Sequence, residues 1–453
     1  MAIKDLKHVH KKTRLGADVF VLNNGAEINA EAEAMLQALH SRSTGGFLEH
    51  LKKLEERGAE KFMASFYVGY GHKSIGDCGS TTIFIEGVSM LVAKAIQDWQ
   101  LYSGQESSTR YVDFSKQAFI NLADSKEGEE IQETWRAFYL KAQDPVRESL
   151  KKRFPIQEGE KEAMWEKAIN ARAFDITRSF LPAGASTNLA WHTNLRQAAD
   201  HIMILRHSPL LEVRELAQAM EEVLREAFES SFSHERFETT ENYNEAWQKT
   251  ENYYHNSKTP DFALEKNEID GGDLEKYREI LEKRPEKTEL PRFLDELGHL
   301  QFSFTLDFGS FRDIQRHRAV MQRMPLLTEE IGFHPWYLAE LPDDLRKEAV
   351  ELIEAQLKKI NDLGLSKEEK QYYLPMGYLT SCRVSGGLPQ IVYLVELRAT
   401  RFVHPTLRER AQQMAKVLEE KFGSSGLKLH LDEDAHRFDV RRGEHDIVEK
   451  GSE

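Results

Sequence analysis

The chain has 453 residues, and its 61 basic and 75 acidic side chains give a formal net charge of −14. This length predicts two or three domains, each large enough to bury a core. A hydrophobic content of 40% with 24 Phe and 14 Tyr excludes wholesale disorder, and the acidic balance argues against a broad nucleic-acid surface. Two cysteines exclude a disulfide framework.

Targeting signals are not expected in this sequence. The first residues are charged from the third position onward, unlike the apolar stretch of a signal peptide. The most apolar run, residues 83–96, contains Glu86 and Lys94 and is too short to span a bilayer. We therefore expect a cytoplasmic protein without a membrane segment.

The first half reads mainly as helix. Residues 30–63 are predicted as helix with a break at 43–46, and a glycine-rich turn follows at 69–80. Further predicted elements are a short alternating strand at 81–87 and helices at 88–101, 128–153, 160–180, 187–207 and 210–228.

Residues 239–290 differ in composition from the segments on either side. They are polar, acidic and poor in Leu, Ile and Val, which predicts a partly ordered linker. Alternatively, Trp247, Tyr253 and Tyr254 in this segment cover a cleft.

A second series of predicted elements follows the linker. It consists of a strand at 302–308, a basic amphipathic helix at 310–323, helices at 343–362, 390–398 and 406–421, and a Leu-Pro turn at 374–375.

The last of these helices repeats an earlier one. HPTLRERAQQMAKVLEEKF near the C-terminus has the spacing of SPLLEVRELAQAMEEVLREAF at 208–228. The sequence therefore predicts a fused duplication with related domains at 1–238 and 291–440, the linker between them, and a solvated tail at 441–453. The expected fold is α+β, with two helix-rich domains that each contain a small antiparallel sheet.

Two short motifs contain the residue types that bind phosphates. SGQESSTRY at 103–111 supplies hydroxyls, a carboxylate and a guanidinium, and Arg-His-Arg at 316–318 supplies cations. Each is weak alone, because a polar loop or a solvated basic turn explains it equally well. The histidines of His-Val-His at 8–10 and of the C-terminal segment (His430, His436 and His445) lack the partners of a metal site and are predicted to lie at the surface.

Taken together, the motifs resemble those of the flavin-dependent thymidylate synthases, present twice. That family carries R-H-R-x-x-S-x-N-E-x-S-x-R-Y after a G-H-x-S turn. The first half has GHKS (71–74) and then DWQLYSGQESSTRY (98–111), in which Asp98, Trp99 and Gln100 replace Arg-His-Arg. The second half retains Arg-His-Arg and loses the rest of the motif. These complementary losses predict a composite site that combines the nucleotide loop of one repeat with the flavin contacts of the other.

The resemblance also implies roles for individual residues. It places Ser103, Glu106, Ser108, Arg110 and Arg178 at the nucleotide; Arg316, His317, Arg318, Ser74, Asn194 and Arg196 at the flavin; and Arg398, or alternatively Arg206, facing the uracil ring. Arg206 stands one residue later than the family pattern requires, so its orientation is open.

The implied activity is the reductive methylation of dUMP to dTMP. FAD would serve as cofactor, with NADPH and methylenetetrahydrofolate as co-substrates. The alternatives are a non-catalytic protein that binds a nucleotide or flavin, and a flavin-dependent methyltransferase acting on another uracil-containing molecule. The family works as a tetramer, so two fused copies are expected to form a homodimer with pseudo-tetrameric symmetry.

Overall fold

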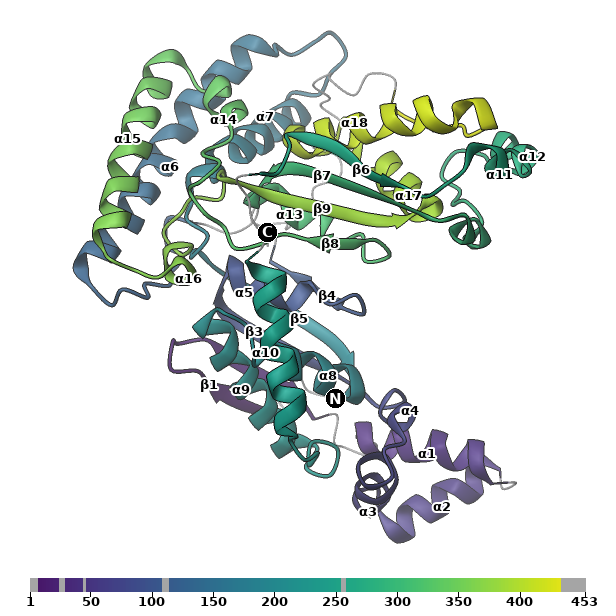
Figure 1. Cartoon of the computed structure of the whole chain (residues 1–453). Coiled ribbons are helices and arrows are strands. Elements are labelled where there is room, and N and C mark those ends of the chain that lie inside the picture. Colours follow the sequence, from purple (N-terminus) through teal and green to yellow (C-terminus); the bar gives the residue numbers. More distant parts are fainter. Residues whose placement is uncertain (1–6, 24–28, 44–45, 108–113, 254–257, 433–453) are drawn as a thin grey trace. The chain divides into compact units, whose positions relative to one another are not determined.

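The computed structural model of the chain describes residues 7–23, 29–43, 46–107, 114–253 and 258–432 (Figure 1). Within these ranges, no helix is both long and apolar enough to cross a membrane. The chain forms two compact units, and each is described by itself. Unit 1 comprises residues 1–112, 117–120 and 185–252, and unit 2 comprises residues 113–116, 121–184 and 253–453.

A five-stranded antiparallel sheet is the centre of unit 1. Its strands lie in the order β1-β2-β3-β5-β4. Their bounds are β1 His8–Lys12, β2 Asp18–Leu22, β3 Ser80–Ser89, β4 Ser103–Glu106 and β5 Ser186–Asn194. Along β3, Ile83 and Ile85 are fully buried while Phe84 between them is exposed, because successive side chains point to opposite faces of a strand.

Three helices of unit 1 begin at a polar capping residue, and the long helix α9 (Leu211–Ala227) buries one apolar face. The three caps are Asn29, Ser89 and Asn194, and each accepts a backbone N–H bond. The helices are α1 Ala30–Arg42, α2 Phe47–Arg57, α3 Glu60–Phe62, α4 Lys73–Gly76, α5 Met90–Gln97, α8 Leu195–Leu205, α9 Leu211–Ala227 and α10 Glu238–Asn252. In α9 the buried residues Val213, Leu216, Met220, Val223 and Leu224 recur at helical spacing, and the helix packs on β1 and β2.

Unit 2 contains a four-stranded antiparallel sheet in the order β6-β7-β9-β8 (Figure 1). Its strands are β6 Phe262–Asn267, β7 His299–Asp307, β8 Met321–Arg323 and β9 Leu379–Gly387. Its helices are α6 Lys126–Arg153, α7 Glu162–Thr177, α11 Gly271–Glu275, α12 Arg278–Lys283, α13 Phe308–Ile314, α14 Pro335–Glu340, α15 Asp343–Asp362, α16 Lys367–Lys370, α17 Leu388–Arg398 and α18 Pro405–Phe422. The two small antiparallel sheets and the many helices confirm the predicted α+β class.

The element order repeats, as a duplication requires. The series β2-β3-α5-β4-β5-α8-α9 in the first half corresponds to β6-β7-α13-β8-β9-α17-α18 in the second, with the same strand neighbours. Ser89 caps α5 and Asp307 caps α13 at equivalent positions. Counted from these caps, Trp99 and His317 occupy the same place in the two repeats.

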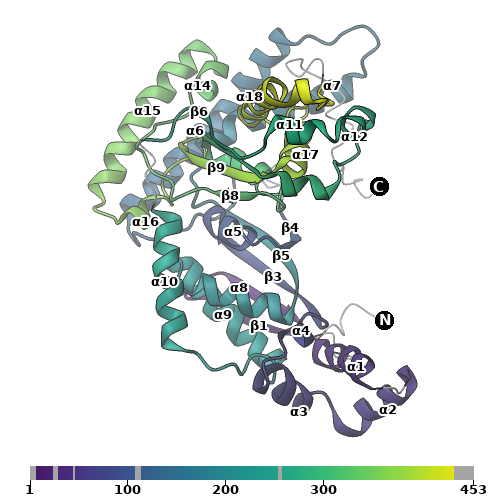
Figure 2. The same cartoon turned by 45° about the vertical axis from the view of Figure 1, so that its right-hand side comes forward.

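The compact units do not follow the predicted linear boundaries, since residues 121–184 of the first repeat belong to unit 2. The two Leu-Pro segments cause this by pairing with each other: Ala183 N–H donates to the Leu374 carbonyl and Met376 N–H donates to the Leu181 carbonyl, both at 2.9 Å. Helices α6 and α15, from the two repeats, also pack side by side (Figures 1 and 2).

Three sequence-based predictions of local structure are corrected. The expected linker 239–290 instead contains α10, strand β6 in the second sheet, α11 and α12. The expected helix 187–207 is strand β5 as far as Asn194 and helix α8 only from Leu195, and the expected helix 310–323 ends at Ile314 and is followed by β8. In each case pairing with a distant strand determines the conformation, which the local pattern does not contain.

His404, which caps α18, predicts a pH dependence of stability. Its side chain is buried beside Trp336 and Tyr337, and burial lowers its pKa to about 4. The unfolded chain takes up this proton near pH ~6.5, so the native state loses stability as pH falls from there toward 4. We expect His404→Asn, which keeps a capping acceptor, to reduce the loss of unfolding free energy between pH 7 and pH 5 by about 2 kcal/mol.

Urea unfolding at both pH values measures this effect. His299→Asn, which replaces an exposed histidine of β7 in the same unit, serves as the control and should leave the pH dependence unchanged. Equal pH dependence in the wild type and in His404→Asn would contradict the assignment.

Candidate functional site

His317 and Arg398 lie in contact in unit 2, although the sequence separates them widely. His317 follows α13 and Arg398 is the last residue of α17. The Arg398 Nε–H donates to His317 Nε2 at 2.7 Å. The Tyr393 ring, one turn earlier on α17, meets the His317 ring edge-to-face at 5.8 Å. Two residues that the resemblance places in one site are thus brought together by the fold.

Burial sets the protonation of this pair. The His317 ring is buried, and burial together with the nearby Arg398 charge lowers the pKa of His317 to about 3. The neutral imidazole therefore accepts the Arg398 bond near pH 7. Burial also lowers the pKa of Arg398. Among the described residues, no carboxylate lies within ion-pair distance of Arg398, so none of them pairs with the terminal nitrogens of this guanidinium.

The other two residues of Arg-His-Arg flank this pair. Arg316 is strongly exposed and lies 4.0 Å from the Asp313 carboxylate, and Arg318 is also exposed. The tripeptide thus presents two cations to solvent on either side of a buried histidine. These residues follow α13 in a turn rather than in a helix, so the in–out arrangement comes from the fold and not from helical spacing.

In the first repeat, Trp99 takes the place of His317. Its indole Nε1–H donates to Gln197 Oε1 at 3.0 Å, and its ring stacks on His201 with the centroids 4.8 Å apart. Asp98, in the position of Arg316, pairs with Lys94. A bulky ring and a carboxylate therefore stand where the second repeat has a neutral acceptor and a cation.

Arg206 does not resemble Arg398 in its surroundings. Helices α8 and α17 are both 11 residues long, but Arg398 is the last residue of its helix and Arg206 is the residue after. Arg206 donates to Glu221 at 3.1 Å and to Glu241 at 2.7 Å. Its terminal nitrogens are held by these two carboxylates, so the structure favours Arg398 of the two predicted candidates.

The predicted nucleotide residues lie in different surroundings. Ser103 is exposed on β4, and Glu106 at the end of that strand accepts a bond from Gln97 Nε2 at 2.8 Å. Arg178 is largely buried and lies 3.8 Å from the fully buried Asp175 of α7. Ser108 and Arg110 lie outside the described residues.

The remaining predicted flavin contacts belong to unit 1. Asn194 caps α8 by accepting the Gln197 N–H at 2.8 Å, and Arg196 forms an ion pair with Asp77 at 2.7 Å. Ser74, in α4, is exposed. These groups lie near one end of β5 and α8, whereas Arg316, His317 and Arg318 belong to unit 2.

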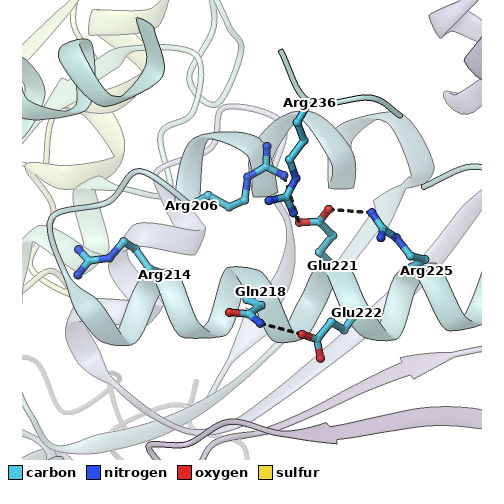
Figure 3. A pocket seen from close by; sticks show the side chains of 7 residues that line it. All are labelled: Arg206, Arg214, Gln218, Glu221, Glu222, Arg225 and Arg236. Carbon is cyan, nitrogen blue, oxygen red and sulfur yellow. Dashed lines mark hydrogen bonds and ion pairs between the residues drawn. The ribbon is translucent and has the colours of Figure 1, made fainter. Parts of the chain in front are cut away.

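The structure also contains a hollow that motif analysis missed. It encloses about 460 Å³ beside α9 and is lined by Arg206, Arg214, Gln218, Glu221, Glu222, Arg225 and Arg236 (Figure 3). The signal present in the sequence was the spacing of charged residues on the solvent side of α9. An amphipathic helix normally has such a face, so the spacing alone does not indicate a site.

The fold and the site define a duplicated α+β protein whose second repeat surrounds a neutral histidine with arginines. Residues 25–230 match the family model described as thymidylate synthase complementing protein. The match confirms the predicted resemblance for this part of the chain.

Relatives of similar length cover both repeats. A UPF0159 protein of Chlamydia muridarum is 26% identical, and the match covers 90% of each chain. A UPF0159 protein of Chlamydia pneumoniae is 24% identical with the same coverage. A UPF0159 protein of Thermoplasma acidophilum is 23% identical over 79% of this chain and 86% of its own.

Proposed function

We propose that the protein is a flavin-dependent thymidylate synthase-like enzyme that methylates dUMP to dTMP with methylenetetrahydrofolate and NADPH. The observation that carries the proposal is the contact between Arg398 and His317. These are the two residues that the family resemblance assigns to the uracil ring and to the flavin. The family match over residues 25–230 supports the same class of activity.

The residues around His317 fit the binding of FAD. A flavin dinucleotide carries two phosphates, which require cationic donors, and the exposed side chains of Arg316 and Arg318 supply them. His317 between them is neutral, so FAD binding does not require the desolvation of a third charged group. Bound FAD would supply the hydride chemistry, because no amino-acid side chain can do so.

Arg398 is the residue we assign to the substrate. Its Nε is fixed by His317, which orients the guanidinium and leaves the two terminal nitrogens to donate to an anionic oxygen. Negative charge that develops on the uracil ring would be stabilised by these donors. His317 thus positions Arg398 and must stay neutral to do so, which its lowered pKa ensures. The nucleotide-binding role of 103–111 and the homodimer stay predictions.

A non-catalytic binding protein is the second candidate. The observation that favours it is the replacement of the flavin-binding tripeptide in the first repeat, where Trp99 packs on His201. The first repeat has thereby lost one whole set of flavin contacts. A flavin-dependent methyltransferase acting on another uracil-containing molecule shares the proposed chemistry and differs in its acceptor.

FAD binding tests the proposal first. We expect the purified protein to take up one FAD per chain, measured by flavin absorbance against protein concentration. His317→Ala should weaken FAD binding by at least about tenfold, because it removes a side chain that the resemblance assigns to the flavin and with it the energy of about one hydrogen bond. Trp99→Phe, at the matching position of the first repeat, should leave it unchanged. A protein that takes up no FAD would exclude the proposed enzyme, and two FAD per chain would contradict the assignment to the second repeat alone.

A further inference from the structure

The hollow beside α9 contains more positive charge than its own carboxylates can neutralise. Four of its lining residues are arginines and two are glutamates, whereas the whole chain has a net charge of −14. Glu222 is also paired with Lys11 of β1. Glu241, next to the hollow, is shared between Arg206 and His207. A local cationic excess of this kind attracts anions.

Glu221 bonds to three of these arginines. It accepts from Arg206 at 3.1 Å, from Arg225 at 3.3 Å and from Arg236 at 2.6 Å (Figure 3). Burial alone would raise the pKa of Glu221, but the bonds and charges of Arg236 and Arg206 lower it, so the group is a carboxylate near pH 7. One carboxylate cannot form bidentate pairs with three guanidinium groups.

Much of the hydrogen-bonding capacity of the arginines is therefore unused. Arg225 and Arg236 each donate to Glu221 through one terminal nitrogen, and their side chains are 53% and 54% exposed. Arg214 uses one terminal nitrogen for the carbonyls of Ser208 and Pro209. Within the described part of the chain, the other nitrogens of these three side chains have no hydrogen-bond partner.

We propose that this hollow is a binding site for a small phosphate-bearing anion, formed by residues other than those that the proposed function assigns to the flavin and the uracil ring. Guanidinium forks match the geometry of phosphate oxygens. The volume of about 460 Å³ lies within the usual range of small-molecule sites. The anion bonds to Arg225 and Arg236 through the nitrogens that Glu221 leaves free, and Arg214 closes the opposite end of the hollow.

Isothermal titration of the FAD-saturated protein with inorganic pyrophosphate at low ionic strength tests the site, because bound FAD would occupy the proposed phosphate contacts of Arg316 and Arg318. The double variant Arg225→Gln/Arg236→Gln should weaken pyrophosphate binding by at least about tenfold, since it removes two charged forks. The control Arg14→Gln removes an exposed arginine that also bonds to an α9 glutamate, Glu215, outside the hollow, and should leave the affinity unchanged. No saturable binding, or equal affinity in the double variant, would overturn the proposal.

Glu221→Gln separates an anion site from a purely structural network. Glu221 competes with the ligand for the same arginines, so its neutralisation should tighten pyrophosphate binding by about threefold or more. A purely structural role predicts weaker or unchanged binding, and unfolding cannot produce a gain. Titration with AMP and with inorganic phosphate shows whether the site takes the phosphate group of a nucleotide or free phosphate. Tighter binding of triglutamate than of pyrophosphate would overturn the choice of phosphate over carboxylate.

Discussion

Replacement of Arg398 by alanine is expected to lower the rate of dTMP formation by at least about 100-fold, the usual effect of removing a donor to a developing anion. Arg398 is held at Nε by a neutral histidine and has no carboxylate partner among the described residues. Its terminal donors are therefore already oriented for a ligand, and no residue in the described part of the chain occupies them. The measurement is dTMP formed from dUMP, methylenetetrahydrofolate, NADPH and FAD under single-turnover conditions.

Two further variants make this result specific. Arg398→Lys keeps the charge but cannot bond to His317 and the ligand together, so it should recover only a small part of the rate. Arg147→Ala removes a partly exposed arginine of α6 in the same unit, paired with Asp144, and should retain the wild-type rate. A rate in Arg398→Ala within about threefold of the wild type, well below the expected loss, would remove Arg398 from the proposed site.

The duplication and the long helices could be predicted from the sequence because they depend on local periodicity. Helix α9 repeats apolar residues at helical spacing, and α18 repeats the same pattern. The predicted bounds 210–228 and 343–362 match α9 and α15 closely. These helices bury a continuous apolar face, so the pattern that identifies them is also what stabilises them.

Strand β6 shows why other elements could not be predicted. The second half of this strand is polar, with Glu265, Lys266 and Asn267, and the surrounding segment 239–290 is poor in Leu, Ile and Val. The strand forms because it pairs with β7 and because Asp261, just before it, bonds to the buried Arg410 of α18. Both interactions join residues far apart in the sequence. The composition of a short stretch of the chain therefore cannot predict these long-range interactions.

The candidate site was predictable in its residue types but not in its geometry. Motif spacing selected His317 and Arg398, but only the fold shows that they touch. A shift of one residue turns a side chain by about 100° around a helix. Arg206 is displaced by that amount from the position of Arg398, and it bonds to Glu221 and Glu241. Only the structure resolves which of the two arginines remains available.

Arg284 provides the sharpest test that residues 239–290 belong to the fold of unit 2. Its buried guanidinium bonds to both carboxylate oxygens of Glu396 in α17 and to the carbonyls of Thr288 and Lys428. Arg284→Ala would leave the mostly buried Glu396 charge without its cationic partner. We expect a loss of about 3–5 kcal/mol in the free energy of unfolding, measured by urea unfolding followed by far-UV circular dichroism.

The same segment supplies the control for this variant. Arg278 of α12 pairs with Glu275 and Glu282 at the surface, so Arg278→Ala should cost less than about 1 kcal/mol. The double variant Arg284→Met/Glu396→Leu should recover much of the Arg284→Ala loss, because no unpaired buried charge remains. If residues 239–290 were a linker outside the fold, Arg284→Ala and Arg278→Ala would have equally small effects. A large loss for Arg284→Ala alone instead means that this polar segment contributes a buried ion pair to the core of unit 2.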